Sequence, residues 1–268
     1  MHPIEQLRYV ARAGAADGRV LVEEAAGALR VFANDPAGLL TACKRLLTRQ
    51  PAVGPLWWLC TRLVLSADTR SERRHVIDEL RSDRTDRRLA TALADGATVG
   101  LCGWPDAVVE GLARRGDCSA LVVDVEGLGG SVVRRLERSS VEAEYVDGAR
   151  MAGLVSEVDV VILEAGACGP SAALVDIGGL ALAATARLIG RPVWLAVPTG
   201  TLLPEPYWQE IVERAFDPDL PAFLAPYEVV GLGLVDRVLR SDCELPGGQL
   251  GSATADCPVA PELLVSAR

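Results

Sequence analysis

Residues 97–125, ATVGLCGWPDAVVEGLARRGDCSALVVDV, decide the fold. Two short runs of residues typical of β-strands, 97–102 and 120–125, enclose a stretch whose apolar residues recur at helical spacing. A strand, a helix and a second strand in this order are typical of a right-handed βαβ unit, in which the two strands lie parallel. The stretch therefore predicts the beginning of a parallel sheet.

The same alternation continues toward the C-terminus. Half of the residues are apolar but only 4% are aromatic, which indicates a core of Ala, Val and Leu. Such a core suits helices packed on both faces of a parallel sheet. We therefore predict an α/β fold in which residues 96–242 form a Rossmann-like, doubly wound, mostly parallel sheet. Further strands are expected at 141–146, 158–163 and 193–197, and helices at 105–115, 129–139, 148–156 and 172–189.

The regions on either side of this sheet have different patterns. Residues 1–95 predict a helical N-terminal domain, and Asp35-Pro36 is a typical helix start because the aspartate accepts from free amides. Residues 243–268, rich in glycine and proline, are expected to form a mobile C-terminal tail without a site. In the N-terminal domain, helices are expected at 36–50, 55–65 and 71–94.

Composition argues against several classes of function. A net charge of -9 without a dense basic stretch disfavours binding to nucleic acid, which needs clustered Lys and Arg. The N-terminus lacks the pattern of a signal peptide, and no apolar run is long enough to span a membrane. The seven cysteines are odd in number and lack metal-ligand spacing, so we expect neither a disulfide framework nor a metal. We expect a cytoplasmic protein without a cofactor.

Candidate ligand-binding residues follow the carboxyl ends of the predicted strands. In open α/β sheets these loops converge, and helix N-termini supply free amides there. The glycine-rich loop at 126–131 offers amides that could hold a phosphate, or it could be only a tight connection. The other loops span 102–105, 147–148 and 164–171, and the candidate ligand-binding residues are Gly103, Glu126, Gly129, Gly130, Asp147, Gly166 and Gly178.

Three residues are candidates for catalysis. Cys102 ends the first strand just before a predicted helix, whose macrodipole would lower the pKa of the thiol, although a free cysteine is often only a small buried apolar residue. Glu164 ends the most apolar strand, and Asp176 is expected near the start of the next long helix. Two carboxylates facing one crevice would suit general acid–base chemistry, but an acidic residue there could equally cap the helix.

The strongest likeness to a known family lies in residues 146–167, VDGARMAGLVSEVDVVILEAGA. This segment is similar to the strand, Asp turn, helix and apolar strand of the superfamily that unites the regulatory subunits of eukaryotic initiation factor 2B with methylthioribose-1-phosphate isomerase and ribose-1,5-bisphosphate isomerase. The resemblance covers most of residues 20–240. Weaker matches lie at 51–57, 176–179, 191–198, 226–230 and 234–238.

The resemblance implies a helical N-terminal domain, a Rossmann-like C-terminal domain and a homodimer. The family's isomerases interconvert an aldose phosphate and a ketose phosphate with a cysteine after the first strand and an aspartate in a Gly-Ala-Asp loop. Cys102 matches the cysteine, whereas Gly166 stands at the aspartate position. Asp176 stands where the family has a lysine, so a negative charge would face a phosphorylated substrate.

These departures leave three hypotheses of function. The first is a divergent family member that binds a small phosphorylated sugar or nucleotide-like ligand without the standard isomerase activity. The second is an aldose–ketose isomerase that uses Cys102 with Glu164 as a relocated carboxylate, because Glu164 and residue 166 share a face of an extended strand. The third is an assembly subunit that acts through its surface.

Overall fold

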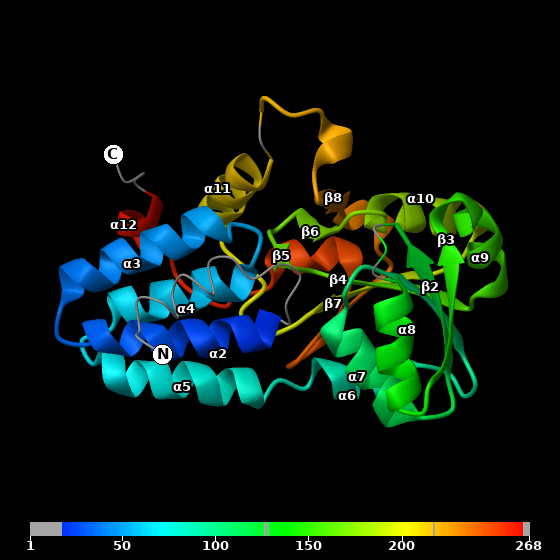
Figure 1. The fold of residues 1–268 in the computed structure, drawn as a ribbon, viewed down its shortest axis with the longest axis horizontal. Coiled ribbons are helices and arrows are strands. Elements are labelled where there is room, and N and C mark those ends of the chain that lie inside the picture. The colour runs from blue at the N-terminus through cyan, green and yellow to red at the C-terminus, as the bar shows by residue number, and fades with distance from the viewer. Residues whose placement is uncertain (1–17, 126, 128, 217, 265–268) are drawn as a thin grey trace.

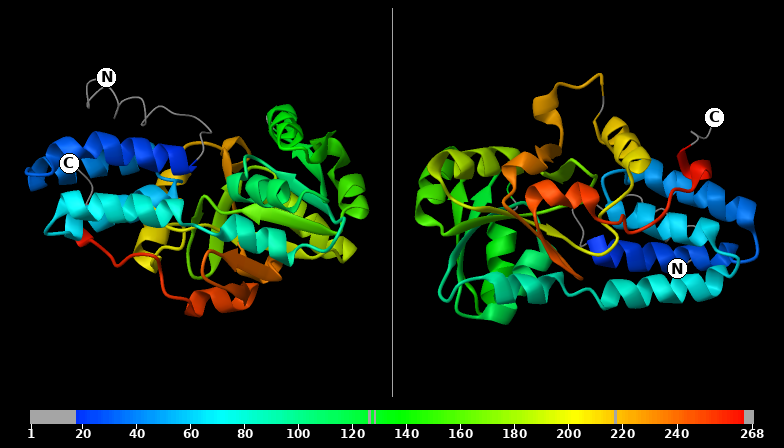
Figure 2. Two further views of the ribbon diagram at one scale, coloured as in Figure 1. Left: turned by 90° about the horizontal axis from the view of Figure 1, so that it is seen from below. Right: turned by 180° about the vertical axis from the view of Figure 1, so that it is seen from behind.

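The computed structural model describes residues 18–264 except 126, 128 and 217. Four N-terminal helices form most of one end of the molecule, and the main sheet forms the other end (Figures 1 and 2). The third helix lies at the centre of the helical end, where Trp57, Trp58 and Leu59 are fully buried. The four helices are α2 (Gly18–Leu29), α3 (Pro36–Arg49), α4 (Gly54–Leu65) and α5 (Thr69–Arg81).

The predicted helix start at Asp35-Pro36 is confirmed. The Asp35 carboxylate accepts a 2.9 Å hydrogen bond from the Gly38 amide. The single helix expected at 71–94 is wrong, because the chain breaks at Ser82 and resumes as α6 (Thr85–Ala92). Leu89 of α6 is buried in the core of the sheet rather than among the N-terminal helices, so tertiary packing decides where this charged stretch divides.

The main sheet has seven strands in the order β10-β9-β7-β4-β1-β2-β3. Every neighbouring pair is parallel except β9 and β10. The predicted α/β class and mostly parallel sheet are therefore confirmed. The strands are β1 (Thr98–Cys102), β2 (Ser119–Asp124), β3 (Glu142–Asp147), β4 (Val160–Glu164), β7 (Val193–Val197), β9 (Arg237–Arg240) and β10 (Glu244–Pro246).

Helices cover both faces of this sheet. Along β4, Val160 and Ile162 join the core beneath one layer of helices, while Val161 and Leu163 join the core beneath the other. This alternation follows from the two-residue period of a strand. The layer over Ile162 contains α6, α7 (Asp106–Arg115) and α8 (Gly129–Arg138), and the layer over Leu163 contains α9 (Met151–Glu157) and α10 (Gly179–Ile189).

A second, antiparallel sheet interrupts the expected helix at 172–189. Its strands are β5 (Ala167–Cys168), β6 (Ala172–Asp176) and β8 (Tyr227–Gly231), in the order β5-β6-β8. The prediction of helix is wrong for 172–176, because this short apolar run pairs with β8, a partner distant in sequence. The helix starts only after Gly178, whose φ of 91° ends the strand geometry.

The expected mobile tail is also wrong for the residues that the structure describes. β10 pairs with β9, and Leu250, Ala260 and Leu263 are fully buried. The tail crosses the sheet end and returns to the helical end, where α12 (Pro261–Leu264) packs beside α3 (Figure 1). A few well-spaced apolar residues therefore suffice to hold a segment rich in glycine and proline. The remaining long helix is α11 (Glu205–Ala215), and no helix among the described residues is long and apolar enough to cross a membrane.

Candidate functional site

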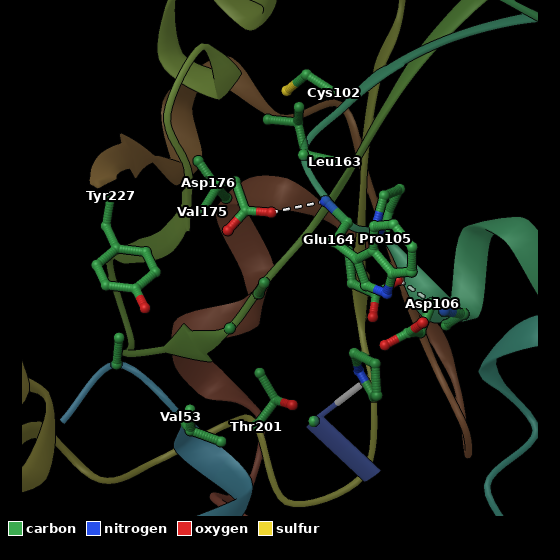
Figure 3. A pocket seen from close by; sticks show the side chains of 18 of the residues that line it. Val53, Cys102, Pro105, Asp106, Leu163, Glu164, Val175, Asp176, Thr201 and Tyr227 are labelled. Carbon is green, nitrogen blue, oxygen red and sulfur yellow. Dashed lines mark hydrogen bonds between the residues drawn. The ribbon is translucent and has the colours of Figure 1, made fainter. Parts of the chain in front are cut away.

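A cavity of about 420 Å³ lies where the helical end meets the carboxyl ends of β1 and β4. The chain runs from β1 to β2 and β3 on one side and from β4 to β7 and β9 on the other, so the strand order reverses between β1 and β4. Loops that leave two such neighbouring strands diverge and leave a crevice between them. The predicted location of a ligand site, at the C-terminal edge of the sheet, coincides with this cavity (Figure 3).

Six of the ten predicted site residues line the cavity. Gly130, Asp147 and Gly178 do not line it, and Glu126 lies outside the described residues. The Asp147 carboxylate instead accepts from the Ala149 amide at 2.8 Å on the edge strand β3. The six lining residues are Cys102, Gly103, Gly129, Glu164, Gly166 and Asp176.

Glu164 joins the end of β4 to the first turn of α7. Its Oε2 accepts hydrogen bonds from the amides of Ala107 at 2.8 Å and Val108 at 3.2 Å. Desolvation, reinforced by repulsion from Asp106, raises the pKa of Glu164 well above its ordinary value, although the two amide bonds oppose this rise. Glu164 is therefore a carboxyl group that holds a proton more readily than an exposed glutamate does.

Asp176 makes a similar contact between the small sheet and the loop after β1. Its Oδ2 accepts a 2.8 Å hydrogen bond from the Trp104 amide (Figure 3). Desolvation raises the pKa of Asp176, and the bond from Trp104 lowers it by a smaller amount. A Cβ on Gly103, whose φ is 69°, would lie 2.1 Å from Oδ2 of Asp176. Glycine at 103 is therefore required by this carboxylate.

Asp124 is a third carboxylate at the cavity that the sequence analysis missed. It ends β2, and its Oδ1 accepts a 3.2 Å hydrogen bond from the Gly129 amide at the start of α8. The sequence prediction selected Glu126, two residues later, as the acidic residue of this loop. The end of β2 is the feature that identifies Asp124. The strand ends at Asp124, one residue earlier than the predicted strand at 120–125.

Of the two possibilities for Cys102, the structure favours a small buried apolar residue over an activated thiol. The side chain is only 7% exposed, and burial together with the charges of Asp176 and Glu228 raises its pKa to about 12. The first amides of α7, whose dipole was expected to favour a thiolate, are bound to Glu164 instead. Cys102 lies at the opposite end of the lining side chains from Val53 and Thr201 (Figure 3).

The helical end also contributes lining residues that sequence reasoning did not identify. Arg19 from the start of α2 points toward Asp83 and Glu110, with N–O distances of 3.9 and 3.8 Å. The two ends also meet through backbone alone, because the Gly54 amide donates a 2.7 Å hydrogen bond to the Gly166 carbonyl. No local motif marks these residues, since only the tertiary fold brings them to the sheet.

The lining is strongly acidic. Six carboxylate residues face one cation, Arg19, among the described residues that line the cavity. Asp106 is also paired with Arg135, whose guanidinium lies over the Trp104 ring. No three His, Cys, Asp or Glu side chains in the described part of the chain are grouped as metal ligands. The six acidic residues are Asp83, Asp106, Glu110, Asp124, Glu164 and Asp176.

Solved structures show what fold this is. No family model matches the chain, and no curated protein matches it significantly. The translation initiation factor eIF-2B of Pyrococcus horikoshii OT3 is similar with a TM-score of 0.77 at 14% identity, covering 91% of this chain and 96% of its own. The eIF2B beta subunit of Chaetomium thermophilum has a TM-score of 0.70 at 17% identity, covering 99% and 93%.

A third similar structure is a tetrameric eIF2B-beta2-delta2 complex from C. thermophilum, with a TM-score of 0.69 at 16% identity, covering 93% of this chain and 92% of that one. Together these likenesses show that the chain has the fold of eIF2B subunits along nearly its whole length. The resemblance predicted from the sequence is confirmed at the level of the fold.

Proposed function

We propose that this chain is a divergent eIF2B-like protein that binds a small ligand in the cavity between its two ends and lacks the standard sugar-phosphate isomerase activity. The observation that carries the proposal is the state of the catalytic positions at this cavity. Gly166 supplies no carboxylate, and its amide and carbonyl are both used, by Leu174 and Gly54. A cavity of about 420 Å³ is within the usual range for small-molecule sites.

The thiol of Cys102 supports the same conclusion. Moving a proton between adjacent carbons requires a group that can accept a proton at neutral pH and a second group that can donate one. A thiol with a pKa of about 12 is almost entirely protonated at neutral pH and is a poor general base. Asp176, at the position of the family's lysine, adds negative charge where a phosphate would have to bind.

The alternative is an aldose–ketose isomerase in which Cys102 works with Glu164. Two observations favour it: both groups line the same cavity, and the raised pKa of Glu164 suits a proton donor. In this case the carboxylate has moved from residue 166 to residue 164. Catalysis would then depend on both side chains.

Turnover separates the two candidates. Purified protein is incubated with methylthioribose 1-phosphate or ribose 1,5-bisphosphate, and formation of the ketose phosphate is followed by phosphorus NMR. We expect no conversion by the wild type above the level of a Cys102→Ala variant. Conversion that disappears in both Cys102→Ala and Glu164→Gln, while the fold is retained, would contradict the proposal and establish the isomerase.

We also propose a homodimer in the cytoplasm. The similar beta2-delta2 tetramer supports an assembly role for this fold, and the seven unpaired cysteines are typical of a reducing compartment. Light scattering coupled to size-exclusion chromatography tests the dimer. A mass of twice 28.3 kDa is expected, and a mass of one chain at micromolar concentration would contradict it.

A further inference from the structure

The cavity presents hydrogen-bond acceptors whose second oxygen is unused. Asp124, Glu164 and Asp176 each bind a backbone amide through one carboxylate oxygen. Their other oxygens, Oδ2 of Asp124, Oε1 of Glu164 and Oδ1 of Asp176, make no hydrogen bond to any described residue. In its ionised form each of these groups only accepts hydrogen bonds, so a ligand that fills this space and meets the ionised groups has to be a donor.

Three of the amides at the cavity that could hold a phosphate are already occupied. In α/β proteins an anion binds at the free amides of helix N-termini and of the loops before them. Here the amides of Trp104, Ala107 and Gly129 all donate to the protein's own carboxylates. A phosphate could reach them only by displacing a carboxylate into a cavity that is already acidic, which costs both a charge-assisted bond and added repulsion.

An unpartnered hydroxyl at the cavity wall gives an independent indication of a polar ligand. Thr201 is only 1% exposed and lines the cavity, and its hydroxyl makes no hydrogen bond to any described residue (Figure 3). The hydroxyl oxygen keeps some accessible surface, so it faces the cavity, and a polar group there is normally satisfied by a partner or by water. A ligand hydroxyl or amine would supply that partner.

From these observations we propose that the cavity selects a small polyhydroxylated molecule carrying a protonated amine, and that it rejects the phosphate ester of the same molecule. This inference rests on the proposed function, because it assumes that the cavity binds a ligand. An ammonium group offers three donors and a positive charge to Asp124, Glu164 and Asp176, and its charge favours the ionised forms of Glu164 and Asp176, which burial alone disfavours. Hydroxyls supply donors and acceptors to Thr201. A phosphate offers only acceptors and negative charge to the same groups.

Four hexoses separate the contribution of the amine from that of the phosphate. Glucose, glucosamine, glucose 6-phosphate and glucosamine 6-phosphate are titrated into the full chain at pH 7, with binding measured by calorimetry and by the shift in melting temperature. We expect glucosamine to bind at least about tenfold more tightly than glucose, which corresponds to one charge-assisted hydrogen bond. Each phosphate ester should bind more weakly than its parent sugar.

Variants locate the binding in the cavity. Asp124→Asn keeps an oxygen for the Gly129 amide but removes the charge, and Thr201→Val keeps the shape but removes the hydroxyl. We expect Asp124→Asn to weaken glucosamine binding about tenfold and Thr201→Val to weaken it by about three- to tenfold. Glu157→Gln, which removes one exposed charge outside the cavity, should leave it unchanged.

The outcomes distinguish this inference from the proposed function. Tighter binding of either phosphate ester than of its parent sugar would overturn the inference and leave ligand binding intact. Absence of binding by glucosamine at millimolar concentration, or equal weakening by Asp124→Asn and Glu157→Gln, would also overturn it. Turnover of a phosphosugar, by contrast, would overturn the proposed function itself.

Discussion

The carboxylate of Glu164, the last residue of β4, accepts a 2.8 Å hydrogen bond from the backbone amide of Ala107 in the first turn of α7. The residue that precedes α7, Pro105, makes no side-chain cap of its own. A residue from a strand distant in sequence therefore caps the helix. Caps of this kind contribute about 1 kcal/mol to stability, and here the cap also fixes the loop between β1 and α7.

Substituting Glu164 by glutamine should change the pH dependence of stability. The pKa of Glu164 is raised in the folded protein, so ionisation costs stability as the pH rises from its ordinary value of 4.5 through the raised value. Glutamine cannot ionise, and its amide oxygen can still accept from Ala107. Relative to the wild type, Glu164→Gln should therefore gain stability between pH 5 and pH 8 in urea unfolding. A difference in unfolding free energy between the variant and the wild type that does not vary with pH would contradict the raised pKa of Glu164.

Alanine at Gly103 should be more costly than alanine at another glycine with positive φ. Gly103 and Gly116 have φ values of 69° and 76°, but only at Gly103 would a Cβ collide with another residue, Asp176. Gly116→Ala should cost about 1–2 kcal/mol for the left-handed backbone. Gly103→Ala should cost about 1–3 kcal/mol more, because the carboxylate is pushed away from the Trp104 amide. Urea unfolding measures both, and equal losses would show that the contact is unimportant.

The C-terminal segment should stabilise the protein through one buried ion pair. The Arg240 side chain is 9% exposed and bonds Asp256 at 2.8 Å and the largely exposed Asp242 at 3.2 Å. Asp256→Ala should cost about 3–5 kcal/mol, because it leaves a buried guanidinium without its main partner. Asp242→Ala should cost about 0–1 kcal/mol. Similar losses for the two variants in denaturant unfolding would indicate that the segment is not fixed by this pair.

Cys102 should be among the least reactive cysteines of the folded chain. Its pKa of about 12 and its burial leave almost no thiolate at pH 8. Cys243 is more exposed and should react with iodoacetamide much faster. Peptide mapping by mass spectrometry after timed labelling gives both rates, and labelling in guanidinium chloride shows that each peptide is detectable. Faster labelling of Cys102 than of Cys243 would support a nucleophilic role instead.

Local patterns in the sequence predicted the main sheet because each of its central strands is apolar enough to be buried on both faces. The run 193–197 matches β7 residue for residue, and Asp35 caps α3 through a bond that involves only neighbouring residues. Both features depend on short-range chemistry. The edge of the sheet at which a ligand would bind followed from the same alternation, because parallel strands have a common carboxyl end.

The features that were missed depend on contacts between distant segments. The strand at 172–176 exists because it pairs with 227–231, and the C-terminal segment is ordered because Asp256 meets Arg240 and the Leu202 amide. The thiol of Cys102 is desolvated by its tertiary surroundings, a property that its position before a helix does not reveal. The contribution of Arg19 to the cavity likewise required the arrangement of both ends.

The reversal of strand order between β1 and β4 has a consequence for how this protein could change over time or be redesigned. Neither exit loop can close the gap that the diverging backbone leaves, whatever residues the loops carry. The path of the chain therefore determines that a cavity is present, while the side chains that line it determine its charge and polarity. Substitutions among the side chains that line the cavity can therefore change which molecule binds, while the fold and the cavity itself are kept.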